Sequence, residues 1–352
     1  MASKNNTIRS VAIISYFRHH TKFVGYKNVL RYTKPIKIFG IDYNRNNSRI
    51  LLSHYFVHEF ITRFKTIGSK FDVLHIMYGE DYFRFSHWLF PGKKIVVTFH
   101  QPSEILFQEL SRGNYNGRVA GFTHTLTRKR LKKIDAAIVM TEDQKKVVSQ
   151  FINIKKIHVI PLGVELGELN NQYANSDPEL RNQNQLITVG EWQRDWDMYL
   201  NIVEYAKKVH PQLKFILVNK NITDQLRRRL ESYDNIIYKE NISAEELSKL
   251  YLSSLAMFLP LKSSAGNNAL NEGLALGCPV ISNLTFEHLK DQEKFIFKFD
   301  EESGFSCQLK KLQNLDNNER KNISDLCNQS VQKFSWESVS NKLMEVYKSI
   351  LK

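Results

Sequence analysis

The chain has 352 residues, of which 42% are hydrophobic and 24% charged, a composition that excludes a disordered chain and favours a globular protein with room for two domains. No apolar run approaches the roughly 20 residues that a membrane-spanning helix needs. Three widely spaced cysteines without a CxxC pair argue against a disulfide framework or a cysteine-based metal site, and they favour a reducing compartment.

The net charge of +14 lies in the first half of the chain. Residues 1–170 contain 27 Lys and Arg against 12 Asp and Glu, a net of +15, whereas residues 171–352 contain 23 against 24, a net of −1. A basic domain attracts nucleic acid, an anionic membrane surface or an anionic substrate. A domain from a lysine-rich proteome, with no such partner, explains the same charge. The N-terminal segment has no uninterrupted apolar stretch, so we expect no cleaved signal.

Short apolar runs rich in Val and Ile alternate with helical segments along the first half of the chain. The expected strands are residues 10–15, 34–41, 71–79, 93–100, 135–141 and 156–163. Helical periodicity appears over 53–68 and 141–152, and Thr141 fits the N-cap of the second helix. Alternating strands and helices predict a parallel sheet with helices on both faces.

The Asn-rich stretch 168–185 lacks periodicity and predicts a linker. After it the alternation resumes, with strands expected at 186–191, 213–220, 235–240, 255–261 and 279–283. The sequence therefore predicts an α/β fold of two Rossmann-like domains, 1–168 and 184–334, that face each other across a cleft. Ligands of such sheets bind beyond the carboxyl ends of the strands.

The stretch GNNALNEGLALGCPVI (266–281) predicts a polar loop, a helix over 268–276 and a buried strand. Gly277 fits a helix C-cap, and the proline at 279 prevents continuation. The backbone N–H groups of 266–269 and the helix dipole form an anion site. Glu272 lies one turn further, about 5.4 Å of rise, which suits the step from a diphosphate to the diol of a ribose. A capped helix with an exposed Glu272 explains the spacing equally well.

The segment SAGNNALNEGLALGCPVIS resembles the donor-site motif of retaining GT-B glycosyltransferases, the group 1 or family 4-like class. Enzymes of this class have two Rossmann-like domains and use a nucleotide-sugar donor. In their motif two glutamates, separated by seven residues, precede the small-residue helix. The second glutamate falls on Glu272, which the resemblance implies binds the ribose. The first falls on Ser264, and this departure leaves the identity of the donor sugar open.

The segment LITVGEWQRDW resembles the strand and loop that open the donor domain of this class, where basic side chains hold the diphosphate. Glu191 replaces the usual arginine, so the resemblance makes Arg194 the candidate phosphate-binding cation. A surface ion pair with Asp195 or Asp197 is the alternative. Lys262 is either a second cation or a solvated lysine. We interpret the DWD sequence at 195–197 as a helix start and not as a metal motif.

The resemblance also implies acceptor-side residues in the first domain. His100 follows a strand, at a position where related enzymes place a histidine that contacts the donor sugar or positions the reacting groups; a structural role is the alternative. His19, His20 and Gly25 lie in the first loop between strand and helix, which closes over the donor phosphates and the acceptor in this class.

Two acids, Glu80 and Asp81, follow another strand of the first domain. Either would bind acceptor hydroxyls or act as a base, and two solvated loop acids are the alternative. The segment FSWESVSNKLMEVYKSILK resembles the C-terminal helix that packs back on the first domain in this class, which adds 335–352 to that domain. The basic run 127–135 predicts either a helix that meets anionic headgroups or a solvated helix face.

These features together predict a GT-B glycosyltransferase that moves a sugar from a nucleoside-diphosphate donor to a glycan or lipid-linked acceptor, with retention of configuration. The catalytic candidates are His100, Arg194 and Glu272. The donor-binding candidates are Gly25, Arg194, Lys262, Ser264, Gly266, Asn267, Asn268, Ala269 and Glu272.

We expect no metal, no further cofactor and no nucleic-acid partner. We expect a cytoplasmic protein that lies peripherally at the inner face of a membrane. The alternatives are a nucleotide-sugar epimerase or a phosphorylase on the same fold, a catalytically inactive GT-B scaffold, and a basic nucleic-acid-binding protein.

Overall fold

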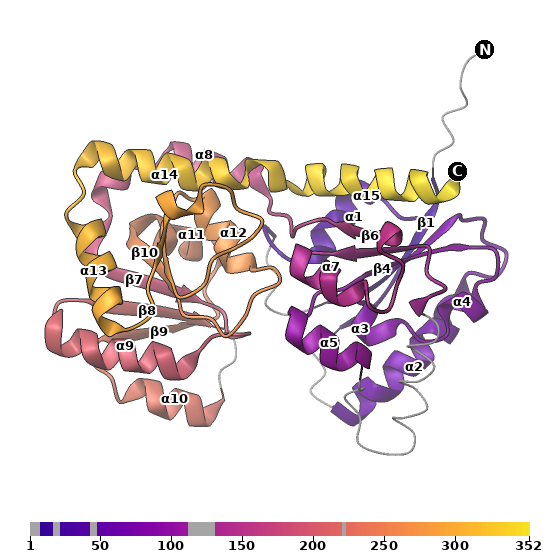
Figure 1. The fold of residues 1–352 in the computed structure, drawn as a ribbon, viewed down its shortest axis with the longest axis horizontal. Coiled ribbons are helices and arrows are strands. Elements are labelled where there is room, and N and C mark those ends of the chain that lie inside the picture. The colour runs from indigo at the N-terminus through magenta and orange to yellow at the C-terminus, as the bar shows by residue number, and fades with distance from the viewer. Residues whose placement is uncertain (1–7, 17–21, 43–47, 112–130, 220–222) are drawn as a thin grey trace, which may run out of the picture. The chain divides into compact units, whose positions relative to one another are not determined.

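The computed structural model describes residues 8–16, 22–42, 48–111, 131–219 and 223–352, which form two compact units (Figure 1). The first unit holds the first strand, Tyr26–Leu162 and Trp336–Lys352. The second unit holds residues 22–25 and Gly163–Ser335. Each unit is built around one sheet of six strands, all of them parallel, as the alternating pattern predicts.

The sheet of the first unit has the strand order β2-β1-β3-β4-β5-β6. The strands pair in register from Ser10 opposite Val73 and from Val73 opposite Lys94. The elements of this unit, in chain order, are β1 (Ser10–Tyr16), η1 (Tyr26–Val29), α1 (Leu30–Thr33), β2 (Lys37–Asp42), α2 (Ser48–Lys65), β3 (Val73–Ile76), α3 (Gly79–Tyr82), α4 (Ser86–Leu89), β4 (Lys94–Thr98), α5 (Ser103–Ser111), β5 (Ala136–Val139), α7 (Glu142–Val148), η2 (Ile154–Lys156), β6 (Ile157–Val159) and α15 (Trp336–Leu351).

The C-terminal helix α15 packs on the first unit, as the resemblance implies. It contacts α1, η1 and β4, and its Trp336 side chain is completely buried. The hydroxyl of Tyr347 lies 2.6 Å from Nδ1 of His75 on β3, and Nε2 of the same ring lies 2.7 Å from Oγ1 of Thr98 on β4. This buried polar chain ties the end of the sequence to two central strands, because each buried polar atom needs its partner.

The sheet of the second unit has the order β12-β11-β10-β7-β8-β9. Its elements are α8 (Leu166–Ala174), η3 (Pro178–Leu180), β7 (Asn182–Val189), α9 (Trp196–Val209), β8 (Lys214–Asn219), α10 (Asp224–Glu231), β9 (Ile236–Glu240), α11 (Ala244–Ser253), β10 (Ser254–Leu259), α12 (Asn268–Ala275), β11 (Val280–Ser282), η4 (Gln292–Lys294), β12 (Ile296–Lys298), α13 (Glu302–Gln313), α14 (Asn317–Val331) and η5 (Gln332–Phe334).

Both faces of this second sheet are buried. Successive residues of β10 alternate between two cores, so that Met257 packs with α8, α11, α12 and α14, whereas Phe258 packs with α9, α10 and α13. Figure 1 shows α8 and α14 on one side of these strands and α9 and α10 on the other. The period of two along β10 therefore carries apolar side chains on both faces, as a central strand of a covered parallel sheet requires.

The prediction of a linker at 168–185 is wrong. Helix α8 covers its first part, and β7 begins at Asn182. Leu166 and Leu169 bury two positions of α8 in the core, while Asn170 accepts a hydrogen bond from Asn328 of α14 at 3.0 Å. The asparagines lower the helix propensity of this segment, and the packing of the two leucines overrides it. Strand β12 and helices α13 and α14 were not identified from the sequence.

Candidate functional site

The strand order places the switch point of the second sheet between β7 and β10. These two strands are neighbours, and the chain continues from β7 to one side of the sheet and from β10 to the other. Ligands of open parallel sheets bind beyond the carboxyl ends of the strands at such a switch point. The loops concerned are 190–195 and 260–267. The predicted residues Arg194, Lys262 and Ser264 all lie in them.

Hydrogen bonds hold these two loops against each other. The N–H of Lys262 donates to the carbonyl of Gln193 at 3.0 Å, and the N–H of Asp195 donates to the carbonyl of Pro260 at 3.0 Å. Asp195 is also the N-cap of α9, since its side chain accepts from the N–H of Met198, which confirms that 195–197 begins a helix. The site therefore has a fixed backbone built from segments that are 70 residues apart in the sequence, as the 3.2 Å contact of Ser263 with Gln193 illustrates.

Arg194 lies buried at the base of these loops. Only 6% of the residue is exposed, and its guanidinium donates to the carbonyl of Val189 at the end of β7. Among the described residues Arg194 forms no ion pair, and Asp197 instead pairs with Arg229 at 3.1 Å. The alternative of a surface ion pair is therefore wrong. Burial lowers the pKa of Arg194 to about 10, so the side chain stays a cation at neutral pH, and its Nε has no hydrogen-bond partner in the described structure.

Helix α12 begins directly after the loop that follows β10. The side chain of Asn267 caps it by accepting from the N–H of Leu270 at 3.2 Å, and Oδ1 of Asn268 is a buried acceptor without a partner in the described structure. Glu272, one turn later, is only 3% exposed. An exposed Glu272 on an ordinary surface helix is therefore excluded. The whole stretch 269–275 is buried, because Gly273 lets the helix approach β10 closely: a Cβ there would lie 2.2 Å from the sulfur of Met257.

Tyr251 of α11 feels the charges of both Arg194 and Glu272. Its buried hydroxyl donates to the carbonyl of Ala269 at 3.2 Å. Burial raises the pKa of Tyr251; the charge of Glu272 raises it further, while that of Arg194 opposes the rise. Both charges therefore act on one buried phenol, whose hydroxyl contacts the first turn of α12.

The other predicted donor-side residues differ in exposure. Lys262 and Gly266 are exposed, and Ser264 is half-buried. Gly25 is buried and has a φ of +101°, which suits glycine. His19 and His20 lie outside the described residues, as does most of the basic run 127–135.

His100 in the first unit lies two residues beyond β4, as predicted. Its ring stacks on Tyr78 with centroids 4.3 Å apart and meets the edge of Tyr26 at 4.8 Å. Nε2 lies 2.8 Å from the carbonyl of Met77, so this nitrogen carries the proton and Nδ1 is left as an acceptor. Burial lowers the pKa of His100 to about 4. The ring is therefore neutral at physiological pH and held in one orientation.

Glu80 and Asp81 lie in the first turn of α3, at the switch point between β1 and β3 of the first sheet. Neither is a solvated loop acid, because both are half-buried. One oxygen of Glu80 accepts hydrogen bonds from the backbone N–H groups of both His100 and Gln101. The bond from Gln101 is 2.8 Å long. Asp81 accepts from the hydroxyl of Ser15 at 3.4 Å. Glu80 thus holds the loop that carries His100.

The acids of this region share one electrostatic environment. Burial, together with the neighbouring carboxylate of Glu109, raises the pKa of Glu80 to about 8. Burial raises the pKa of Asp81 to about 6, against the opposing charge of Arg84, and burial with the charge of Asp81 raises that of Glu109 to about 7. Sequence reasoning did not identify Glu109, Tyr26 or Tyr78; only Tyr78 had a signal, its place directly beyond β3.

We expect Glu80→Gln to flatten the pH dependence of stability. The folded pKa of Glu80 lies above its usual 4.5, so the folded chain binds more protons than the unfolded chain, and stability falls as pH rises from about 4.5 to about 8. Glutamine keeps the acceptor oxygen but cannot ionise. The urea midpoint of the first unit is measured at about pH 5 and about pH 8. Relative to the wild type, the variant should have a higher midpoint at about pH 8 than at about pH 5. Glu104→Gln, at an exposed position of α5, is the matched control; equal pH dependence in both variants and the wild type would refute the expectation.

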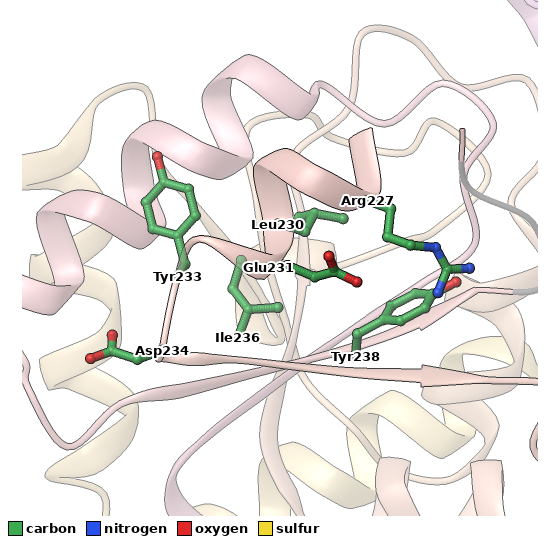
Figure 2. A pocket seen from close by; sticks show the side chains of 7 residues that line it. All are labelled: Arg227, Leu230, Glu231, Tyr233, Asp234, Ile236 and Tyr238. Atoms are coloured by element: carbon green, nitrogen blue, oxygen red, sulfur yellow. The ribbon is translucent and has the colours of Figure 1, made fainter. Parts of the chain in front are cut away.

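A hollow of about 370 Å³ lies elsewhere in the second unit, between α10 and the edge strand β9 (Figure 2). Figure 2 shows the Arg227 side chain beside the ring of Tyr238, with the guanidinium carbon 5.1 Å from the ring centroid. Arg227 also pairs with Glu240 at 3.0 Å. Because the cation already has its partner and the hollow borders an edge strand, we place the candidate site at β7 and β10 instead.

Comparison with known proteins finds a family match in the first half of the chain and a shared fold over the whole of it. Residues 16–168 match the family model described as Glycosyltransferase Family 4, which covers most of the first unit. The solved structure of a glycosyltransferase from Rickettsia africae ESF-5 is similar over 98% of this chain and 99% of its own, with 17% identity and a TM-score of 0.68. No curated protein matches the sequence.

Two further solved structures share the fold. Sucrose-phosphate synthase from Thermosynechococcus elongatus is 15% identical, with 97% of this chain and 99% of that chain covered and a TM-score of 0.71. The trehalose-6-phosphate protein from E. coli, bound with UDP-2-fluoro glucose, is 13% identical, with 96% and 99% covered and a TM-score of 0.73. The predicted GT-B fold is confirmed. Within the described residues no helix combines the length and apolar character that crossing a membrane requires.

Proposed function

We propose that this glycosyltransferase-family fold moves a sugar from a nucleoside-diphosphate donor to a hydroxyl of a glycan or lipid-linked acceptor, with retention of configuration. The observation that carries the proposal is the switch point of the second sheet. There the loop with the buried Arg194, which has no carboxylate partner in the described structure, is hydrogen-bonded to the loop that leads into α12, and α12 carries the buried carboxylate of Glu272. A buried cation is costly unless an anion meets it, and a diphosphate supplies that anion.

In this proposal the diphosphate lies between Arg194 and the backbone N–H groups of 266–269. The helix dipole and the cation together balance its charge, which is why we propose no metal cofactor. Glu272 then accepts hydrogen bonds from the ribose hydroxyls. When the bond between the sugar and the diphosphate breaks, negative charge grows on the leaving phosphate, and Arg194 stabilises it.

The acceptor is proposed to approach the first unit at His100. The neutral ring offers Nδ1 as an acceptor for a sugar or acceptor hydroxyl, while the hydrogen bond to Met77 fixes its direction. Glu80 acts in this account through the loop that it holds, and Asp81 is a second candidate for binding acceptor hydroxyls. The positive charge of residues 1–170 supports an anionic acceptor or a cytoplasmic location at a membrane surface.

Nucleotide binding tests the donor site directly. We expect one of UDP, GDP, ADP and CMP to bind the wild type in calorimetry, and we would test UDP first because the E. coli neighbour is bound with a UDP-sugar. Glu272→Ala should weaken that binding about tenfold or more, because two charge-assisted hydrogen bonds are lost. Glu293→Ala, an acid of η4 in the same unit, is the control.

Failure of all four nucleotides at millimolar concentration would remove the donor site and favour an inactive scaffold.

If one nucleotide binds, product analysis with the corresponding nucleotide-sugar separates the enzymatic alternatives. A donor that is converted without any acceptor indicates an epimerase, whereas transfer that depends on the acceptor supports the proposal. A gel shift with salt-sensitive nucleic-acid binding would favour the basic-protein alternative.

A further inference from the structure

Helix α2 of the first unit turns an apolar side to the solvent. Val57, Phe60, Phe64 and Ile67, the last just beyond the helix, are 48%, 45%, 77% and 64% exposed. Their spacing of three, four and three residues brings them onto one side of the helix. Single exposed apolar residues are ordinary, but a continuous row marks a site of interaction.

Three polar residues of α2 and its C-terminal end face the protein. Glu59, Thr62 and Thr66 are 0%, 0% and 2% exposed. Glu59 accepts the backbone N–H groups at the start of α4, from Arg84 at 3.2 Å and from Phe85 at 2.8 Å. Thr66 donates to the carbonyl of Thr62 at 2.7 Å. The bonds of Glu59 to the segment before α4 fix this orientation, because turning the apolar row inward would break them and leave buried polar groups without partners.

Helix α4 carries a further exposed apolar side chain. It contacts α2, beside which it lies in Figure 1, and its Trp88 is 66% exposed. Phe85, which precedes α4, packs on Phe60 with ring centroids 5.6 Å apart. We call the surface formed by Val57, Phe60, Phe64, Ile67 and Trp88 the outer stripe.

Basic side chains flank the outer stripe. At about 100° per residue, Arg63 and Lys65 fall on opposite sides of the apolar row, and both are exposed. Lys70 is exposed beyond the helix end, and Lys37 reaches that end by donating to the carbonyl of Lys65 at 2.8 Å. The one acid between 57 and 70 is the buried Glu59, so every exposed charge of this segment is positive.

We propose that the outer stripe docks on an anionic lipid surface. Phe64 and Trp88 enter the region between headgroups and acyl chains, and Arg63 and Lys65 meet the lipid phosphates. Aromatic rings favour this depth of a membrane, and basic residues beside them add attraction to anionic lipid. Positive charge on both edges of the row fits a lipid surface better than a protein partner, whose groove would present charges of both signs. This inference does not depend on the proposed sugar transfer.

Flotation with vesicles tests the inference on the full chain. We expect binding to vesicles of equimolar phosphatidylcholine and phosphatidylglycerol and much weaker binding to phosphatidylcholine alone. The double variant Phe64→Ser/Trp88→Ser should lose about tenfold or more in affinity, and Arg63→Gln/Lys65→Gln should lose a similar factor on the anionic vesicles only. Ile154→Ser is the matched control, because Ile154 is 56% exposed beside two lysines of the same unit.

Two outcomes of the flotation experiment would overturn the inference. Equal binding of the Phe64→Ser/Trp88→Ser variant and the control, or no binding of the wild type to either vesicle, overturns the inference. Circular dichroism confirms that the variants are folded. Sedimentation velocity distinguishes a second occupant: a wild-type dimer that the double variant converts to a monomer would assign the outer stripe to self-association instead.

Discussion

Replacing Arg194 by alanine is expected to lower the rate of sugar transfer about 100-fold to 1,000-fold, the usual loss when one donor to a developing anion is removed. The physical reason is burial. Arg194 is 6% exposed, so its charge acts through protein and not through water, and the loss cannot be compensated by solvent. Lysine at this position should restore only part of the rate, because it offers one compact charge in place of a planar fork.

The measurement is steady-state transfer from the nucleotide-sugar identified by calorimetry. Added guanidinium should partly rescue Arg194→Ala, a readout that a merely structural role would not produce. Arg229→Ala is the matched control, since Arg229 is an exposed arginine of the same unit. A rate for Arg194→Ala within a few-fold of the control would exclude Arg194 from the reaction.

Replacing Arg181 by methionine is expected to lower the free energy of unfolding of the second unit by about 2–4 kcal/mol. Arg181 is 6% exposed and donates to the carbonyls of Tyr251 at 2.6 Å, Ser254 at 2.9 Å and Leu276 at 3.0 Å. These carbonyls lie at the end of α11, the start of β10 and the C-cap of α12. Methionine fills similar volume but leaves them without donors, and only part of that loss is offset by removing a buried charge.

Urea unfolding monitored by tryptophan fluorescence measures this loss, because Trp192 and Trp196 report on the second unit. Arg228→Met, at an exposed position of α10, is the control. Since the chain has two units, the two transitions are fitted separately. A loss below about 1 kcal/mol would mean that water reaches the three carbonyls, and that Arg181 does not hold the elements behind the candidate site together.

The sequence by itself determined what depends on neighbours along the chain. Thr141 caps α7, as the local pattern indicates, and Gly277 has a φ of +67° after α12, as its predicted place at the helix end requires. The apolar runs gave eleven strands of the two sheets, because period and composition are local properties. His100 beyond β4 and Arg194 beyond β7 follow from the ends of those strands.

Only the tertiary structure decided which polar residues are buried and what they contact. Glu272 and Arg194 are each compatible with an exposed surface position in the sequence, and their burial depends on α11, β10 and the loop after it. The side of α2 that faces the protein was also decided by the tertiary structure. The residues of α2 predict a helix, but the burial of Glu59 depends on N–H groups 25 and 26 residues away. Burial is a property of contacts between distant segments, so no local pattern contains it.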